Sequence, residues 1–168
     1  MPMEAIFSRR SVRKYTDQPV SEETVKELLA AAMNAPSAGN EQPWHFIVIG
    51  DRATLDQIPA FHPYAGMVKQ APVAILVCGD ETLEKYKGFW VQDCSAAVEN
   101  LLIAAESLDL GAVWVGVYPE AERVAHFRTL LAIPDHVIPL ALIPVGYPAE
   151  KPAPANRFDP SRIHYNRW

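Results

Sequence analysis

Cysteine is scarce in this sequence, and its scarcity excludes one class of fold. Only Cys78 and Cys94 occur among 168 residues, and they form neither a CxxC pair nor a spacing typical of zinc sites. A scaffold held together by disulfides is therefore excluded. Both thiols are predicted to be core residues of a protein in a reducing compartment.

The sequence also lacks a long apolar run and a start that resembles a signal peptide. Residues 1–4 have no positive opening that leads into an apolar segment, and stretches such as 137–145 are too short to cross a bilayer. We therefore expect a cytoplasmic protein with no membrane partner.

An excess of positive charge is absent as well. The chain has 15 Lys and Arg against 20 Asp and Glu, which gives a net charge of −5 and a pI near 5.5. This balance argues against a general nucleic-acid binder. The 49% apolar and 21% charged residues are normal for a globular protein, and the length predicts one domain over 1–168.

Several familiar binding and catalytic motifs are missing. No GxGxxG follows a predicted strand, and the glycines of 111–116 lack the Lys-Ser/Thr pair that a phosphate loop needs. The five histidines form no HxxxH pair, so no metal site is expected. No serine stands in a nucleophile-elbow context, so a hydrolase triad is not indicated.

What the sequence does contain is a dense basic cluster in an acidic chain. Residues 9–15 read RRSVRKY, and guanidinium groups and a serine hydroxyl together suit the binding of phosphate. Residues 36–44 (PSAGNEQPW) are a small, polar, turn-forming stretch before an apolar strand. One interpretation is a two-part cradle for a phosphorylated aromatic cofactor. The other is a solvated basic surface patch.

Hydrophobic periodicity predicts helices separated by short strands. Helices are expected over 3–8, 21–33, 53–61, 90–108 and 119–132. Strands are expected over 44–49, 73–77, 111–118 and 137–145, the first two of them buried. The proline-rich tail 149–168 is predicted to be extended and to pack along a surface through its apolar anchors.

The helix expected over 90–108 is apolar on nearly every side, which is typical of a buried helix. In a domain this small, a partner subunit could supply the remaining cover, and this predicts an obligate dimer. The alternative is an ordinary central core helix.

Taken together, these stretches resemble the nitroreductase family of flavin mononucleotide (FMN) enzymes. The resemblance rests on RRSxRxY at 9–15, PSxxNxQPWxF at 36–46, the helix-to-strand run 97–116, and the ending GYP…R…W from 146 to 168. It implies an α+β fold in which helices flank a mainly antiparallel sheet. It also implies an intertwined homodimer with two FMN molecules in clefts between the subunits.

The resemblance implies roles for individual basic residues. Arg9 and Ser11 would contact the FMN phosphate, and Arg10 would lie near the ribityl chain. Arg157 in the tail would be a further phosphate ligand. Arg13 would face the pyrimidine edge of the flavin, where a fixed cation stabilises the negative charge that reduction places there.

Small residues and backbone groups would contact the flavin ring. From the other subunit, the ring and ribityl chain would be lined by Pro36, Ser37, Ala38 and Asn40. Val115 and Gly116 match a backbone pair beside the ring, where an amide can donate to flavin N5. Many members have a second basic residue two positions before the tail arginine, but this chain has Ala155 there. Phosphate binding would therefore depend more on Arg9 and Arg157.

The implied function is an FMN-dependent NAD(P)H oxidoreductase that reduces nitroaromatics, quinones or similar conjugated electrophiles by ping-pong hydride transfer. The flavin carries the hydride, so no catalytic side chain is expected. Two alternatives stay open: a divergent flavin enzyme of the same fold, for reductive dehalogenation or flavin fragmentation, and a non-catalytic flavin-binding module. Candidate side chains for the substrate cleft are Phe61, Tyr64, Phe89 and Trp90.

Overall fold

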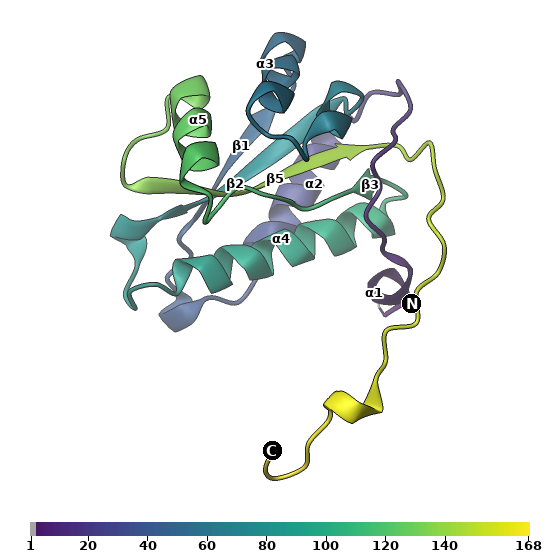
Figure 1. The fold of residues 1–168 in the computed structure, drawn as a ribbon, viewed down its shortest axis with the longest axis vertical. Coiled ribbons are helices and arrows are strands. Elements are labelled where there is room, and N and C mark those ends of the chain that lie inside the picture. Colours follow the sequence, from purple (N-terminus) through teal and green to yellow (C-terminus); the bar gives the residue numbers. More distant parts are fainter. Residues whose placement is uncertain (1–2) are drawn as a thin grey trace.

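The computed structural model describes residues 3–168, and its centre is a five-stranded antiparallel sheet (Figure 1). Strands β1 (Trp44–Ile49), β2 (Val73–Asp80) and β5 (Val137–Gly146) lie side by side in that order. Two short strands, β3 (Gly111–Ala112) and β4 (Val115–Gly116), also pair with β5. The expectation of a mainly antiparallel sheet flanked by helices is confirmed.

The two central strands are apolar along almost their whole length because both faces of the sheet are covered. Every residue of β2 is buried, and so is every residue of β5 except Ile138. Strand β1 lies at the edge of the sheet, and there His45 and Val48 are exposed. The expected strand over 44–49 is therefore right in position, whereas its complete burial is wrong.

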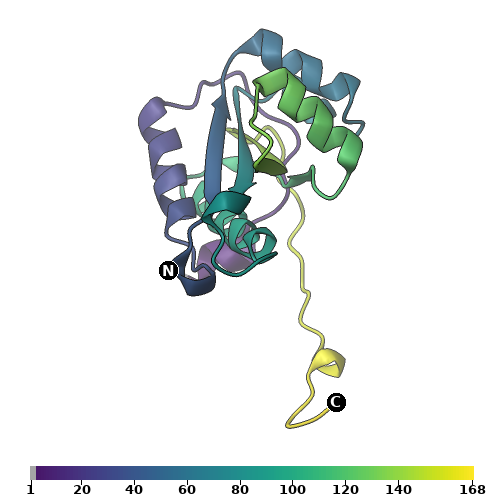
Figure 2. The ribbon, with the colours of Figure 1, turned by 90° about the vertical axis from the view of Figure 1, so that its left-hand side faces the viewer.

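Helices cover the sheet on two faces, as the two views show (Figures 1 and 2). On one face, α2 (Glu22–Met33) and α4 (Trp90–Ser107) pack on Val73, Ile75 and Val77 of β2. On the other face, α3 (Arg52–Gln57) and α5 (Ala121–Leu131) pack on the alternate residues of that strand, Ala74, Leu76 and Cys78. The strand period of two therefore divides the core into two clusters.

Local chemistry explains where these helices begin and end. Helix α2 begins after Ser21, whose hydroxyl accepts a hydrogen bond from the Thr24 N–H, and two glutamates occupy its first turn. Met33, which was expected on the inner face of this helix, is half exposed. Helix α5 begins at Ala121, later than predicted, and the expected strand over 111–118 is divided into β3 and β4.

Helix α4 is not fully covered within one chain. Its inner side is buried against the sheet and α2, and the short α1 (Glu4–Ser8) packs on it as well. Along its outer side, Ala96 and Ile103 are half buried, and Glu99 is exposed. The chain thus leaves a partly apolar stripe of α4 open, and the dimer stays a prediction.

The cysteines lie in the core, as the sequence analysis predicted. Cys78 and Cys94 are both buried and free, and burial raises the pKa of the Cys78 thiol to about 12. Over residues 3–168, no helix is both long enough and apolar enough to cross a membrane.

The N-terminal segment and the start of the tail run beside each other. The Ala149 N–H donates to the Lys14 carbonyl at 2.8 Å, and the Thr16 N–H donates to the Tyr147 carbonyl at 2.9 Å. Farther along, the Arg10 Nε donates to the Ala153 carbonyl at 3.1 Å. These contacts align the tail antiparallel to residues 10–16.

Beyond this contact the tail extends away from the body of its own chain (Figures 1 and 2). A short 3-10 turn at Pro160–Arg162 is its only regular element. Phe158 is 76% exposed and Trp168 is 99% exposed. The tail is extended in a single chain, and Phe158 and Trp168, which were expected to pack along a surface, are exposed there.

We expect Gly111→Ala to lower the free energy of unfolding by about 1–3 kcal/mol. A Cβ at this position would lie 2.6 Å from Val12 Cγ1 and 2.8 Å from Val12 Cβ, so the N-terminal segment would have to shift. Chemical denaturation measures the effect. Gly50→Ala is the matched control, because a Cβ there meets nothing within 4 Å. Equal stability of the two variants would contradict this packing.

Candidate functional site

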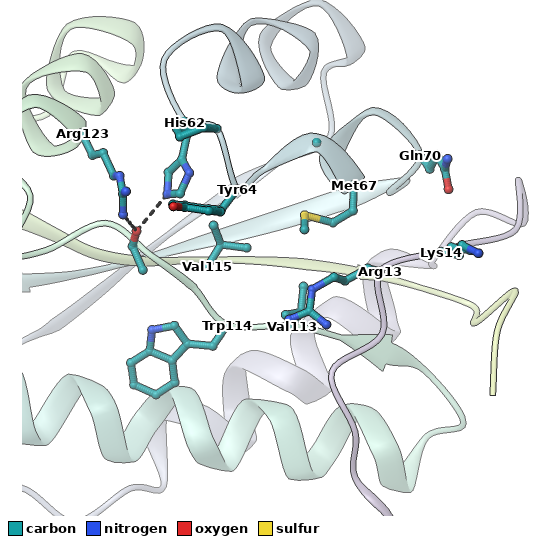
Figure 3. A pocket seen from close by; sticks show the side chains of 13 residues that line it. Arg13, Lys14, His62, Tyr64, Met67, Gln70, Val113, Trp114, Val115 and Arg123 are labelled. Carbon is teal, nitrogen blue, oxygen red and sulfur yellow. Dashed lines mark hydrogen bonds between the residues drawn. The ribbon is translucent and has the colours of Figure 1, made fainter. Parts of the chain in front are cut away.

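A pocket of about 720 Å³ opens where the N-terminal segment, the loop before β2 and strand β4 come together (Figure 3). It contains three of the residues that the sequence analysis assigned to the flavin. The lining residues are Arg13, Lys14, His62, Pro63, Tyr64, Gly66, Met67, Gln70, Val113, Trp114, Val115, Gly116 and Arg123.

Arg13 and Lys14 are held at the pocket by the buried residues on either side of them. Val12 and Tyr15 are each 6% exposed, and the Tyr15 hydroxyl donates to the Val12 carbonyl at 2.7 Å. Burial raises the pKa of Tyr15, so this hydroxyl keeps its proton. The Arg13 N–H donates to Glu150 Oε1 at 2.7 Å. Because the backbone is fixed at these points, the exposed side chains of Arg13 and Lys14 lie at the edge of the pocket.

Strand β4 presents backbone on this pocket, and two side chains fix its carbonyl. The Gly116 oxygen lies 2.8 Å from His62 Nε2 and accepts a hydrogen bond from Arg123 Nη1 at 3.1 Å (Figure 3). His62 is only 1% exposed, and burial lowers its pKa, so the imidazole is neutral and donates its Nε2 proton. A Cβ on Gly116 would meet nothing within 4 Å, so a flat ring has room to approach the backbone there.

The other predicted phosphate ligands lie outside this pocket. Arg9 Nε is 3.6 Å from Glu99 Oε1 on α4, and Ser11 forms a bridge with Ala112 of β3. Arg10 donates to the backbone carbonyls of Phe7 and Ala153. Arg157 lies in the tail and is exposed. Convergence of these arginines on one phosphate stays a prediction.

The turn at 36–40 lies at the far end of α4. The Ala38 N–H donates to Asp93 Oδ1 at 2.9 Å in the first turn of that helix, whereas Ser11 pairs with Ala112 just beyond its last turn. Eighteen helical residues span about 27 Å. Within residues 3–168, Pro36, Ser37, Ala38 and Asn40 are not among the residues that line the pocket, and the turn lies away from Ser11.

A pair of buried carboxyl groups, on Glu41 and Asp93, holds that turn in place. Glu41 Oε2 accepts the N–H groups of Lys85 and Tyr86 at 2.6 and 3.1 Å. Although burial alone would raise it, these donors bring the pKa of Glu41 below its usual value, while burial raises the pKa of Asp93. Among the described residues, Glu41 Oε1 and Asp93 Oδ2 have no other hydrogen-bond partner, and a proton shared between them would satisfy both.

Of the four side chains suggested for the substrate cleft, only Tyr64 lines the pocket. Phe61 instead stacks on His126 with 5.0 Å between ring centres, and Trp90 makes an edge contact with Tyr118. Sequence reasoning missed His62 and Arg123. Neither belongs to a motif, and only the fold brings α5 to the pocket.

Comparison with known proteins identifies the family. Residues 6–62 and 59–147 match the model of the nitroreductase family, and this chain belongs to that family. A relative from Methanothermobacter thermautotrophicus, provisionally named NADH dehydrogenase/NAD(P)H nitroreductase, is 58% identical over 99% of this chain and 87% of its own length.

Solved structures agree with this assignment. One is a protein of Parabacteroides distasonis with the same provisional name. It has a TM-score of 0.96 and 47% identity over 99% of this chain and 98% of its own. Another, a provisionally named nitroreductase of Desulfovibrio desulfuricans in complex with FMN, has a TM-score of 0.86 and 35% identity over 99% and 97% of the two chains.

We expect the Asp93→Asn variant to fold. We also expect its free energy of unfolding, relative to that of the parent protein, to increase as the pH rises. An aspartate whose folded-state pKa is raised loses stability as pH climbs from its ordinary value through the raised one. Asparagine cannot ionise, yet it can accept from Ala38 and donate to Glu41. Asp93→Ala removes both contacts and should cost about 1–3 kcal/mol. Denaturation at several pH values tests the pair, and an Asn variant as unstable as the Ala variant would contradict it.

Proposed function

We propose that this protein is an FMN-dependent NAD(P)H oxidoreductase that reduces nitroaromatics, quinones or similar conjugated electrophiles. The observation that carries the proposal is the meeting of Arg13 with the Val115–Gly116 backbone in one pocket. These are the residues that the family resemblance assigns to the flavin ring. The FMN complex of the relative from Desulfovibrio desulfuricans supports the choice of cofactor.

The pocket residues fit a flat, electron-accepting ring. When bound there, FMN would supply hydride transfer from NAD(P)H to the acceptor, with the accompanying proton taken from water. Arg13 forms no ion pair within residues 3–168, so its charge is available to the ring edge that becomes negative. A backbone N–H of the Val115–Gly116 pair would orient the ring without a group that titrates. The doubly bound Gly116 carbonyl keeps that strand rigid.

We infer that a second copy of the chain completes the site. The turn at 36–40 packs on the first turn of α4 and lines no part of the pocket within residues 3–168, so an FMN molecule bound there would contact the turn of a second chain. The open stripe of α4 and the exposed anchors of the tail are the surfaces that a partner would cover. A homodimer would thus bring the turn of one subunit to the pocket of the other.

We expect the purified protein, loaded with FMN, to be yellow and to lose the flavin absorbance near 450 nm when NADH or NADPH is added without oxygen. Adding a quinone or a nitroaromatic should restore the absorbance. A protein that does not retain added FMN would overturn the proposal. Bound flavin that neither nicotinamide reduces would favour the non-catalytic module, and bleaching that only a halogenated substrate reverses would favour the dehalogenase.

Substitution of single arginines should separate their roles. Arg13→Ala is expected to lower the reduction potential of bound FMN while leaving much of the binding, because its charge acts on the reduced ring. Arg9→Ala and Arg157→Ala each remove a phosphate contact and should weaken FMN binding roughly 10- to 100-fold with little change in potential.

Flavin titration and spectroelectrochemistry give the two quantities for each variant. The exposed Lys26 on α2 provides a control, since Lys26→Ala also removes one positive charge. Equal loss of FMN binding in all three arginine variants, with an unchanged potential, would refute the division of roles.

A further inference from the structure

The pocket has an unusual charge for a protein whose net charge is −5. Arg13, Lys14 and Arg123 line it, whereas no aspartate or glutamate of the described chain does; the nearest carboxylate given by a contact is that of Glu150, which accepts the Arg13 backbone N–H. None of these three cations forms an ion pair within residues 3–168, although Arg9 and Arg52 elsewhere lie beside carboxylates. A pocket lined by one sign of charge attracts ligands of the opposite sign.

The three cations do not lie together. Arg13 and Lys14 come from the N-terminal segment, while Arg123 comes from α5 and lies across the pocket from them, beyond Tyr64 (Figure 3). Under the proposed function, Arg13 serves the flavin. Arg123 is then left for whatever molecule stacks against the ring.

Arg123 is held ready for a ligand by two contacts. Its Nη1 donates to the Gly116 carbonyl at 3.1 Å, and its guanidinium carbon lies 5.5 Å from the centre of the Tyr64 ring. The Gly116 contact uses one of the five guanidinium N–H groups. No other acceptor within residues 3–168 bonds to the rest.

The two rings beside Arg123 carry no negative charge, and the exposed glutamates at 120 and 122 form no ion pair with it within residues 3–168. His62 shares the Gly116 carbonyl with Arg123 and is neutral, because burial and the nearby guanidinium lower its pKa. Tyr64 is 71% exposed, so it offers one ring face to Arg123 while the outer part of the pocket stays open. An oxyanion that reaches the guanidinium therefore meets a partly buried, unpaired cation.

We propose that Arg123 recognises an anionic oxygen group, a carboxylate, sulfonate or phosphate, on the conjugated substrate that occupies this pocket. The inference deepens the proposed function and rests on it. The same chemistry could come from an anionic electron acceptor or from the phosphates of the nicotinamide nucleotide. Both would use the pocket in turn during ping-pong turnover.

A matched pair of acceptors tests this recognition. 4-Nitrobenzoate and 4-nitrobenzamide are nearly equal in shape and differ in charge. In the FMN-loaded protein, kcat/KM for the anion relative to the amide should fall about tenfold or more in Arg123→Gln, since a charge-assisted hydrogen bond is lost. Arg123→Lys should lie between the two, because it keeps the charge and loses the planar fork.

Binding and half-reaction measurements complete the test. Calorimetry should show 4-nitrobenzoate binding weakened by Arg123→Gln and 4-nitrobenzamide binding unaffected. Lys26→Gln, the control for net charge, should change neither. If the variant instead slows flavin reduction by NADH or NADPH and leaves the acceptor ratio intact, the anion recognised is the nucleotide phosphate.

Two outcomes separate the failure of this inference from failure of the proposed function. Normal FMN reduction, with neither the acceptor ratio nor nicotinamide reduction changed in Arg123→Gln, overturns the role of Arg123 alone. A protein that binds no FMN overturns the proposed function. In that case calorimetry with the two nitro compounds still decides whether Arg123 selects an anion.

Discussion

The pairing of residues 11–16 with strand β3 and with the start of the tail is the constraint on which the pocket depends. The Val12 N–H donates to the Ala112 carbonyl at 3.0 Å. The Thr16 N–H donates to the Tyr147 carbonyl, and the Ala149 N–H donates to the Lys14 carbonyl. Gly111 lets Val12 lie against the backbone of β3, because a side chain there would collide with it. This close approach fixes the position of Arg13 opposite strand β4. The packing of Val12 on Gly111 therefore places a positive charge at the pocket.

Much of this fold could be predicted from the sequence because the signals are local. The continuous apolar runs of β2 and β5, the cap at Ser21 and the long apolar pattern of α4 each lie within one segment. The errors arise where tertiary context decides. Burial of β1 depends on its place at the sheet edge, and the division of residues 111–118 into two strands depends on how β5 pairs with them.

The residues of the site could be predicted from the sequence only in part. Arg13, Val115 and Gly116 belong to motifs that could be found in the sequence, and the fold brings them to one pocket. Arg123 has no sequence signal, since a helix with one half-buried arginine is common. Its position follows from the packing of α5 on the sheet and from the Gly116 carbonyl, neither of which is a local property.

Dividing a cofactor site between two copies would couple assembly to cofactor binding. A ligand that binds only the dimer stabilises the dimer by mass action, so FMN would strengthen the association that creates its own site. The Glu41–Asp93 pair fits this requirement, because it fixes the turn at 36–40 before any partner arrives, and a preformed turn loses less conformational entropy on assembly. The tail shows the opposite arrangement. It is already extended, and its large apolar side chains at Phe158 and Trp168 are exposed in the single chain, so their burial would supply a hydrophobic contribution to association.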